Sequence, residues 1–176
     1  FFDFNRALVR TPALSVVNGL RAVDMGAPSY DGVVAEQRAY VGALEEAGVT
    51  TETLPPLEAF PDSVFVEDAA LVFTGEAIVL RPGAPTRRGE AAAIAPELEQ
   101  RFARVLRLEC GSVDGGDVLI TPRGVFIGTS ARTTAEGAEV LCALLAEIGQ
   151  RGVVVATPPG VLHFKSDCAL IDEDTV

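Results

Sequence analysis

Three carboxylates interrupt an otherwise apolar stretch at residues 60–68: Asp62, Glu67 and Asp68. If this stretch is a β-strand, alternate side chains share a face, which places Asp62 and Asp68 together with two valines. Acids on an apolar face stay ionised only where a cation meets them. A planar guanidinium is the best geometric partner, because its donors bind carboxylates in pairs. The alternative is an edge strand whose acids face water or cap a helix.

Four further residues carry groups suited to acid–base and anion chemistry. His163 is the only histidine in the sequence, and imidazole exchanges protons near neutral pH. Asp114 begins an Asp-Gly-Gly-Asp turn, and two glycines between acids make an ordinary tight turn. Arg87 and Arg132 have guanidinium groups that bind carboxylates well, but their spacing does not show that they act as a pair. A core histidine bonded to backbone groups and two solvated arginines account for the same residues.

The three cysteines, Cys110, Cys142 and Cys168, lie in apolar segments. Their odd number favours buried free thiols in a reducing compartment over a disulfide framework. The sequence has no Cys-x-x-Cys pair and a single histidine. We therefore expect no structural zinc site, no other metal and no cofactor.

The charge balance argues against two classes of partner. With 25 acidic and 14 basic residues, the formal net charge is −11. This charge repels nucleic acid and anionic lipid and steers small cations toward any cleft lined by acids, although acidity for solubility alone gives the same composition. No apolar run is long enough to cross a bilayer, and Phe1–Asn5 lacks the pattern of a signal peptide. We expect a cytoplasmic protein that binds neither nucleic acid nor membrane.

The elements that position these groups are predicted as a mixed α/β chain. Residues 7–9 and 49–54 are predicted strands on either side of a helix that Asp31 caps and Gly48 ends. Residues 64–66 and 69–73 are also predicted as strand. The second of these forms a hairpin with residues 77–80, followed by a helix over 90–102 and a strand over 105–108. Pro96 should interrupt that helix.

A similar order then recurs after about 50 residues. Residues 117–120 and 125–128 are predicted as a hairpin, 135–148 as a helix and 152–156 as a strand. Residues 161–165 would open the first strand of a fourth unit. Such an interval is typical of units packed around a common axis.

We therefore expect a ring or propeller of α/β units, forming a single domain over residues 1–176. A ring of this kind must close to cover its strand edges, and about three units with the start of a fourth cannot close it. The chain is accordingly expected to be an incomplete, N-terminal portion, with the remaining units outside it. The alternative is a capped open sheet.

Six motifs occur in order along nearly the whole chain: Arg10-Thr11-Pro12, Phe60–Asp68, Arg81-Pro82-Gly83 with Arg87–Glu90, Asp114–Asp117, Ser130–Thr133 and Leu162–Ser166. Together they resemble the dimethylarginine dimethylaminohydrolase family of the guanidine-modifying, or pentein, superfamily. The resemblance implies an α/β propeller of ββαβ units with a pseudo-five-fold axis. It also implies hydrolysis of dimethylarginine and monomethylarginine to citrulline and the methylamine.

The resemblance implies substrate-binding roles for seven residues: Leu20, Asp62, Phe65, Glu67, Asp68, Arg87 and Arg132. Asp68 would grip the guanidinium, with Asp62 and Glu67 as further acids and Phe65 as a wall. Arg87 and Arg132 would hold the α-carboxylate. The carbonyl of Leu20 and the side chain of Asp62 would meet the α-amino group.

The resemblance makes His163 the catalytic histidine and Asp114 the acid that orients it, a position where some relatives carry glutamate. The family's nucleophile is a cysteine near the carboxyl end, and none of the three cysteines has the matching context, so we expect it beyond Val176. In the implied reaction the thiolate forms a covalent thiouronium intermediate with the substrate. His163 protonates the departing amine and then activates water. The reaction needs no metal.

Two alternatives stay open. An arginine deiminase-like guanidine hydrolase would use the same fold and differ in a few cleft residues. A non-catalytic arginine-binding module would keep the cleft if no C-terminal cysteine exists. The expected partner is a small-molecule substrate, and a homodimer stays open.

Overall fold

The computed structural model describes residues 4–21, 23, 26–172 and 175–176. Phe1–Asp3 belong to the stretch that lacks the pattern of a signal peptide, and they lie outside the described residues. The chain divides into two compact units, with the boundary between Val66 and Glu67. Within the described ranges, no helix combines the length and the apolar character needed to cross a membrane.

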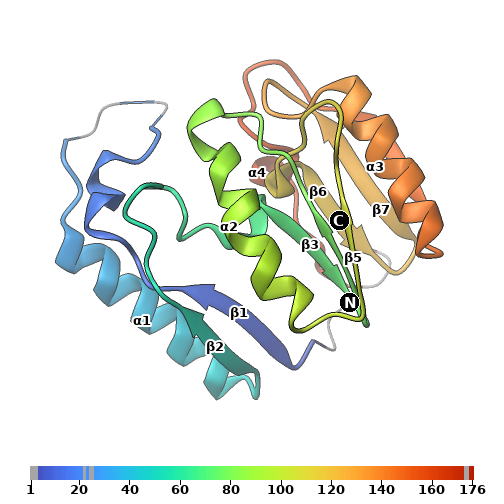
Figure 1. Cartoon of the computed structure of the whole chain (residues 1–176). Helices are drawn as coiled ribbons and strands as arrows, with labels where there is room; N and C mark the ends of the chain where they lie inside the picture. Colours follow the sequence, from blue (N-terminus) through green and yellow to red (C-terminus); the bar gives the residue numbers. More distant parts are fainter. Residues whose placement is uncertain (1–3, 22, 24–25, 173–174) are drawn as a thin grey trace. The chain divides into compact units, whose positions relative to one another are not determined.

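The smaller unit, which ends at residue 66, contains a parallel pair of strands and one long helix. β1 (Arg6–Arg10) pairs with β2 (Thr50–Leu54), and α1 (Tyr30–Glu46) lies alongside them (Figure 1). A parallel pair needs a crossover connection, which α1 and the 3₁₀ turn η1 (Leu14–Asn18) provide. The predicted order of strand, helix and strand is confirmed.

The prediction that Asp31 caps α1 is wrong. Ser29 precedes the helix with extended backbone, and its Oγ accepts a hydrogen bond from the Gly32 amide at 3.3 Å, which is how an N-cap satisfies a free helix amide. Asp31 lies in the first turn, where its charge faces the positive end of the helix dipole. The helix ends just before Gly48, as predicted, and the φ of this glycine is +86°.

Residues 60–68 do not form the predicted strand. The amides of Phe60, Ser63 and Phe65 donate to carbonyls three residues earlier, so the chain turns repeatedly, and η2 (Val66–Asp68) is a 3₁₀ turn. Proline, aspartate and serine favour such turns over a strand. The alternation that was to place Asp62 and Asp68 on one face therefore does not occur.

The larger unit, residues 67–176, begins with a three-stranded sheet. β3 (Ala70–Phe73) and β4 (Glu76–Val79) form an antiparallel hairpin. α2 (Arg88–Glu99) then leads to β5 (Arg104–Arg107), which pairs with β4 in parallel. This is the predicted order, although α2 continues through Pro96 instead of being interrupted. A proline in the last turn removes only one helical hydrogen bond, and its neighbours Ile94, Ala95 and Leu98 are buried.

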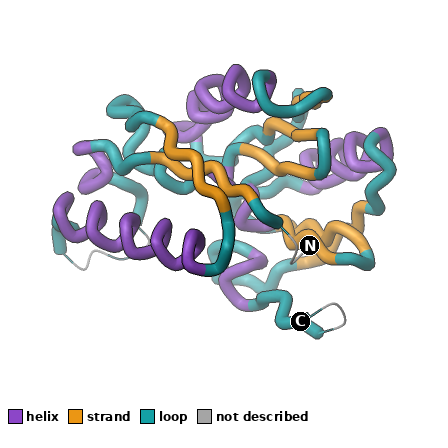
Figure 2. The backbone as a smooth tube through the Cα atoms, turned by 90° about the horizontal axis from the view of Figure 1, so that it is seen from below, coloured by secondary structure: helices purple, strands orange, loops and turns teal. Residues whose placement is uncertain are grey.

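The second sheet of this unit repeats the arrangement. β6 (Val118–Thr121) and β7 (Gly124–Thr129) form the hairpin. α3 (Ala135–Glu147) connects it to β8 (Gly152–Ala156), which is parallel to β7. The paired strands run side by side as orange segments in Figure 2. The predicted repeat is confirmed, and the chain has an α/β fold.

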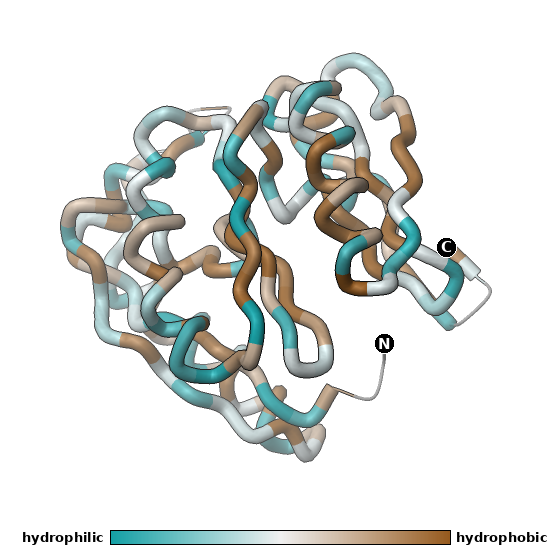
Figure 3. Tube along the Cα trace, turned by 45° about the vertical axis from the view of Figure 1, so that its right-hand side comes forward, coloured by the Kyte–Doolittle hydropathy of each residue, from teal (hydrophilic) through white to brown (hydrophobic). Residues whose placement is uncertain are grey.

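The core of the larger unit joins both sheets to α3. Its fully buried members include one stripe of α3, formed by Ala138, Leu141 and Leu145. This three- and four-residue spacing places them on one helix face. They pack with residues of both sheets and their connections: Leu71, Ile78, Leu80, Leu108, Val113, Val118, Val125 and Ile127. Hydrophobic residues are concentrated along the strands, whereas several connecting turns are hydrophilic (Figure 3).

Residues 161–165 do not form the predicted strand. His163 instead precedes α4 (Phe164–Asp167), a helix of one turn. The amide of Phe164 donates to the Oδ1 atom of Asp117 at 2.9 Å. A side chain 47 residues away thus fixes the backbone beside the histidine.

Candidate active site

The imidazole of His163 faces two carboxylates. Its Nδ1 atom is 3.4 Å from Asp117 Oδ2, and its Nε2 atom is 4.0 Å from Asp114 Oδ2. Asp114 and Asp117 are almost completely buried, whereas the histidine side chain keeps 18% of its area exposed. The imidazole ring therefore lies between two acids, and part of the side chain remains exposed to solvent.

The surrounding acids raise the pKa of His163 above its ordinary value. The interaction with Asp117 is the largest cause, and burial opposes it. The charges of Asp68 and Asp114 add to the rise. The charged imidazolium is therefore favoured to higher pH than in a free histidine, which suits a group that must donate a proton.

The two carboxylates beside His163 differ in their ionisation. Burial raises the pKa of Asp114 and the charge of Asp68 adds to the rise, while the amide of Gly83 partly opposes it by donating at 2.6 Å. Burial also raises the pKa of Asp117. However, interactions with His163, Thr133, Ser130 and the Phe164 amide outweigh burial and bring it below its ordinary value. Asp117 is thus the stronger acid of the two, and Asp114 is the one closer to neutralisation.

Glycines allow the turn η4 (Gly115–Asp117) to approach the histidine. A Cβ atom at Gly116 would lie 2.8 Å from His163 Cγ, and one at Gly115 would lie 1.9 Å from the carbonyl oxygen of Glu67. Neither space admits a side chain. Gly116 therefore lies directly against the imidazole ring, and Gly115 lies against the backbone of Glu67.

A cluster of buried charged side chains adjoins the turn η4. Arg87, at the end of η3 (Pro85–Arg87), donates from Nη1 to Asp68 Oδ2 at 2.5 Å. Its Nε and Nη2 atoms donate to the two oxygens of Glu90 at 3.0 and 2.7 Å. The Gly116 amide donates to Asp68 Oδ1 at 3.0 Å. Asp68 thus lies between a guanidinium and the turn that contacts His163.

The remaining predicted residues of the larger unit lie nearer the surface. Arg132 is half-buried, and no carboxylate among the described residues pairs with its guanidinium. Glu67 is exposed and forms an ion pair with Lys165 at 3.1 Å. The structure therefore separates the two arginines: Arg87 is paired inside the unit, and Arg132 is accessible.

The smaller unit contains the other three predicted residues. The buried carboxylate of Asp62 accepts a hydrogen bond from the Leu20 amide at 2.9 Å, so the structure brings these two residues together. Gly19 allows this approach, since a Cβ there would lie 2.7 Å from Asp62 Oδ1. Phe65 is 58% exposed.

The sequence reasoning assigned no role to several groups around His163 and Arg87. Asp117 lies in a motif and begins a predicted hairpin, and Ser130 and Thr133 lie in another motif, but the sequence indicates no role for them in the site. In the structure, both hydroxyls donate to Asp117. Glu90 follows Arg87 by three residues, and this spacing at a helix start was the signal that could have identified the pair.

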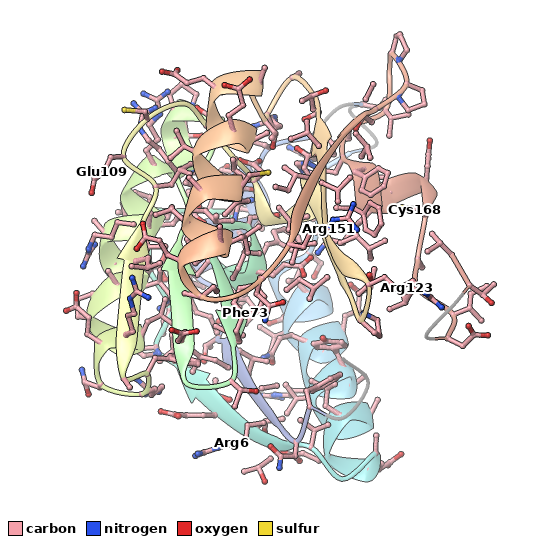
Figure 4. The ribbon with its side chains drawn as sticks, turned by 90° about the vertical axis from the view of Figure 1, so that its right-hand side faces the viewer. Arg6, Phe73, Glu109, Arg123, Arg151 and Cys168 are labelled. Carbon is pink, nitrogen blue, oxygen red and sulfur yellow. The ribbon has the colours of Figure 1, made fainter. Side chains whose placement is uncertain are left out.

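The three cysteines are free, as predicted, but Cys110 is exposed, so its predicted burial is wrong. Burial raises the pKa of Cys142 and of Cys168, and the Sγ atom of Cys168 donates to the Phe164 carbonyl at 3.3 Å. Figure 4 labels Cys168 beside the short helix near the end of the chain. A raised pKa disfavours the reactive thiolate. In the described part of the chain, no group of three or more His, Cys, Asp or Glu side chains could hold a metal ion.

Proteins of known name resemble this chain along nearly all of it. It is 42% identical over 176 residues to N(G),N(G)-dimethylarginine dimethylaminohydrolase of Pseudomonas aeruginosa, which covers 98% of this chain and 68% of that protein. It is 38% identical over 174 residues to the protein of the same name from Streptomyces coelicolor, covering 97% and 67%. No protein-family model matches the chain.

Solved structures give the same result. A cysteine-to-serine mutant of the Pseudomonas aeruginosa protein, complexed with citrulline, matches with a TM-score of 0.87 and 42% identity over 91% of this chain and 63% of that one. The N-terminal domain of ArgZ, a cyanobacterial arginine dihydrolase, matches with a TM-score of 0.77 at 19% identity and so shares the fold. The chain spans about two thirds of the length of these relatives.

Proposed function

The chain belongs to the dimethylarginine dimethylaminohydrolase family, and from this membership we propose that the protein hydrolyses N-methylated arginines to citrulline and a methylamine. One observation carries the proposal in the structure. The buried carboxylate of Asp68 accepts one hydrogen bond from the Arg87 guanidinium and another from the Gly116 amide. Gly116 in turn lies against the ring of His163. A guanidinium-binding acid and a proton-transfer group are thus adjacent.

Asp68 is the proposed ligand of the substrate guanidinium. Because Arg87 already donates to it, a substrate must share or displace that interaction. The cluster of Arg87, Asp68 and Glu90 carries two acids and one base, and the excess negative charge favours a second cation. Arg132 is accessible to a substrate α-carboxylate, and we propose that role for it together with Arg87.

The family resemblance supports further substrate-binding roles. We propose them for Glu67 as a cleft acid, and for Leu20, Asp62 and Phe65 of the smaller unit. The hydrogen bond from the Leu20 amide to Asp62 brings these two residues together, and by family resemblance we propose that the Leu20 carbonyl and the Asp62 side chain meet the substrate α-amino group.

The proposed reaction has two steps. A cysteine thiolate attacks the guanidinium carbon, the bond to the methylated nitrogen breaks, and His163 gives its proton to the departing amine. Neutral His163 then takes a proton from water, the hydroxide adds to the same carbon, and the carbon–sulfur bond breaks to release citrulline. By similarity to the family, we propose that this cysteine lies beyond Val176. Burial raises the pKa of Cys142 and of Cys168, which disfavours the thiolate in both. Asp114 would orient the imidazole through Nε2.

Two finer assignments accompany this function. We propose that the repeated ββαβ order belongs to a propeller with five units, of which this chain is a portion, by similarity to the family. We also propose a cytoplasmic location, because the cysteines among the described residues are free and free thiols are typical of reducing compartments.

The experiment compares kcat/KM for dimethylarginine, monomethylarginine and arginine, by citrulline release from the purified full-length protein. We expect the methylated substrates to be preferred, and His163→Asn to abolish release from all of them. A preference for arginine would instead identify an arginine deiminase-like enzyme. Binding of arginine derivatives without citrulline release would identify a non-catalytic module.

A further inference from the structure

We propose that Asp117 is a positioning residue for His163, holding both the backbone beside the histidine and the Nδ1 edge of its ring. The catalytic consequence of this role rests on the proposed function, whereas the contacts of Asp117 with His163 and Phe164 do not depend on it. Asp114 is the acid that the family resemblance links to the histidine. Asp117 contacts the other ring nitrogen, and it is fully buried.

The carboxylate of Asp117 is itself held in place by three hydrogen bonds. Its Oδ2 atom accepts from Ser130 Oγ at 2.7 Å and from Thr133 Oγ1 at 2.6 Å, and its Oδ1 atom accepts from the Phe164 amide at 2.9 Å. Both hydroxyls come from the loop between β7 and α3. A carboxylate fixed by this many donors cannot rotate away when the imidazole changes its charge.

The Nδ1 atom of His163 depends on this carboxylate. It is buried and has no hydrogen-bond acceptor of good geometry among the described residues. The negative charge of Asp117, whose Oδ2 atom is 3.4 Å away, therefore stabilises a proton on Nδ1. A negative oxygen at this edge favours the form in which Nδ1 carries a proton, as in other acid–histidine pairs. Nε2 then remains the nitrogen that exchanges protons with substrate and water.

Other residues contact the opposite edge and the face of the imidazole ring. Asp114 faces Nε2 at 4.0 Å, and Gly116 lies against the ring carbons, where it leaves no room for a Cβ. Asp68 contributes charge from η2, and Lys165 on α4 is paired with Glu67. Among these groups, Asp117 combines contact with the ring and a hydrogen bond to the backbone of α4.

The test is the titration of His163 by NMR in the full-length protein, with its imidazole signal identified by loss in His163→Asn. Asp117→Asn keeps the side-chain shape and an oxygen for the Phe164 amide but removes the charge at Nδ1. We expect the His163 pKa to fall in this variant and kcat to drop by at least ~10-fold, with KM changed far less. The alkaline limb of the kcat profile should move to lower pH. The matched control is Asp31→Asn, an exposed acid in the first turn of α1, which should leave both quantities unchanged.

The outcomes separate this inference from the proposed function. An unchanged His163 pKa in Asp117→Asn, with kcat intact, overturns the positioning role and leaves the hydrolase assignment standing. If the wild-type protein hydrolyses no arginine derivative, the hydrolase assignment fails, and the shift in titration still decides the geometric claim. If Asp117→Asn does not fold, the wild-type titration decides: a His163 pKa at or below the ordinary 6.5 overturns the proposal.

Discussion

The Nη1 atom of Arg87 lies 2.5 Å from Asp68 Oδ2, and both side chains are almost fully buried. The acid proposed to bind a substrate guanidinium therefore already binds one supplied by the protein. Glu90 contacts the remaining edge of the same guanidinium. The cluster is consequently a structural element of the larger unit as well as a part of the proposed site.

The stability of the protein should depend on Arg87 far more than on Arg132. Arg87→Met leaves two buried carboxylates without their cation, a change that typically costs about 3–5 kcal/mol. Arg132→Met removes a half-buried guanidinium that has no ion pair with a described residue, and it should change the free energy of unfolding by less than ~1 kcal/mol. Urea denaturation at neutral pH measures both. Equal small losses would show that Arg87 is not a structural cation.

Loss of charge at Asp68 should remove activity while preserving the fold. Asp68→Asn keeps its shape and an oxygen for the Gly116 amide, but an amide cannot stabilise a reacting cation as a carboxylate does. We expect kcat/KM for dimethylarginine to fall by at least ~100-fold. Glu109→Gln is the control, because Glu109 is solvent-exposed and has no proposed role in the site, and it should leave kcat/KM unchanged. Circular dichroism checks that both variants are folded. Similar rates for Asp68→Asn and the wild type would mean that the guanidinium binds elsewhere.

A methyl group at Gly116 should disturb catalysis through His163. The added Cβ would lie 2.8 Å from the imidazole Cγ, so the ring must move from its position between the two acids. We expect Gly116→Ala to lower kcat by at least ~10-fold, since small displacements of catalytic groups have effects of this size or more. Gly42→Ala, in α1 with open space around it, should keep full activity and gain ~0.5–1 kcal/mol of stability. Steady-state kinetics that show an unchanged kcat for Gly116→Ala would place the imidazole away from η4.

The acids on either side of His163 should affect stability with opposite sign. The pKa of Asp117 is below its unfolded value of 3.8, so its contribution is present above that pH and is lost as pH falls through the folded pKa. The pKa of Asp114 is above 3.8, so its contribution is present below 3.8 and is lost as pH rises through the folded pKa. At neutral pH, Asp117→Asn should therefore be less stable than Asp114→Asn.

Urea unfolding of the two asparagine variants at several pH values tests this relation. The difference between them should narrow as the pH is lowered through the folded pKa of Asp114 and then that of Asp117. If Asp117→Asn is more stable than Asp114→Asn at neutral pH, Asp117 is not the stronger acid of the two.

Much of the fold follows from patterns that are local in the sequence. The helix stripe of Ala138, Leu141 and Leu145 and the alternating hairpins around Gly75 and residues 122–124 each specify an element from a few neighbouring residues. The wrong strand predictions occur where local side-chain and turn preferences outweigh the apolar pattern. The Pro61–Ser63 segment forms turns despite its apolar neighbours, and the apolar residues before His163 lead into one turn of helix instead of a strand.

The candidate site was less predictable because its contacts join distant residues. The motifs drew attention to Asp68, Asp114 and His163, but no spacing indicates that Arg87 donates to Asp68 or that Asp117 faces Nδ1. These contacts depend on how η2, η3 and η4 pack within the larger unit. Only Glu90, three residues from Arg87, had a local signal for its partner.

The most direct measurement of the central claim is the product balance on dimethylarginine, with citrulline and dimethylamine quantified together. We predict that the full-length protein releases the two in equal amounts and that His163→Asn releases neither. Citrulline accompanied by ammonia from unmethylated arginine alone, or tight binding of dimethylarginine without any product, would contradict the assignment.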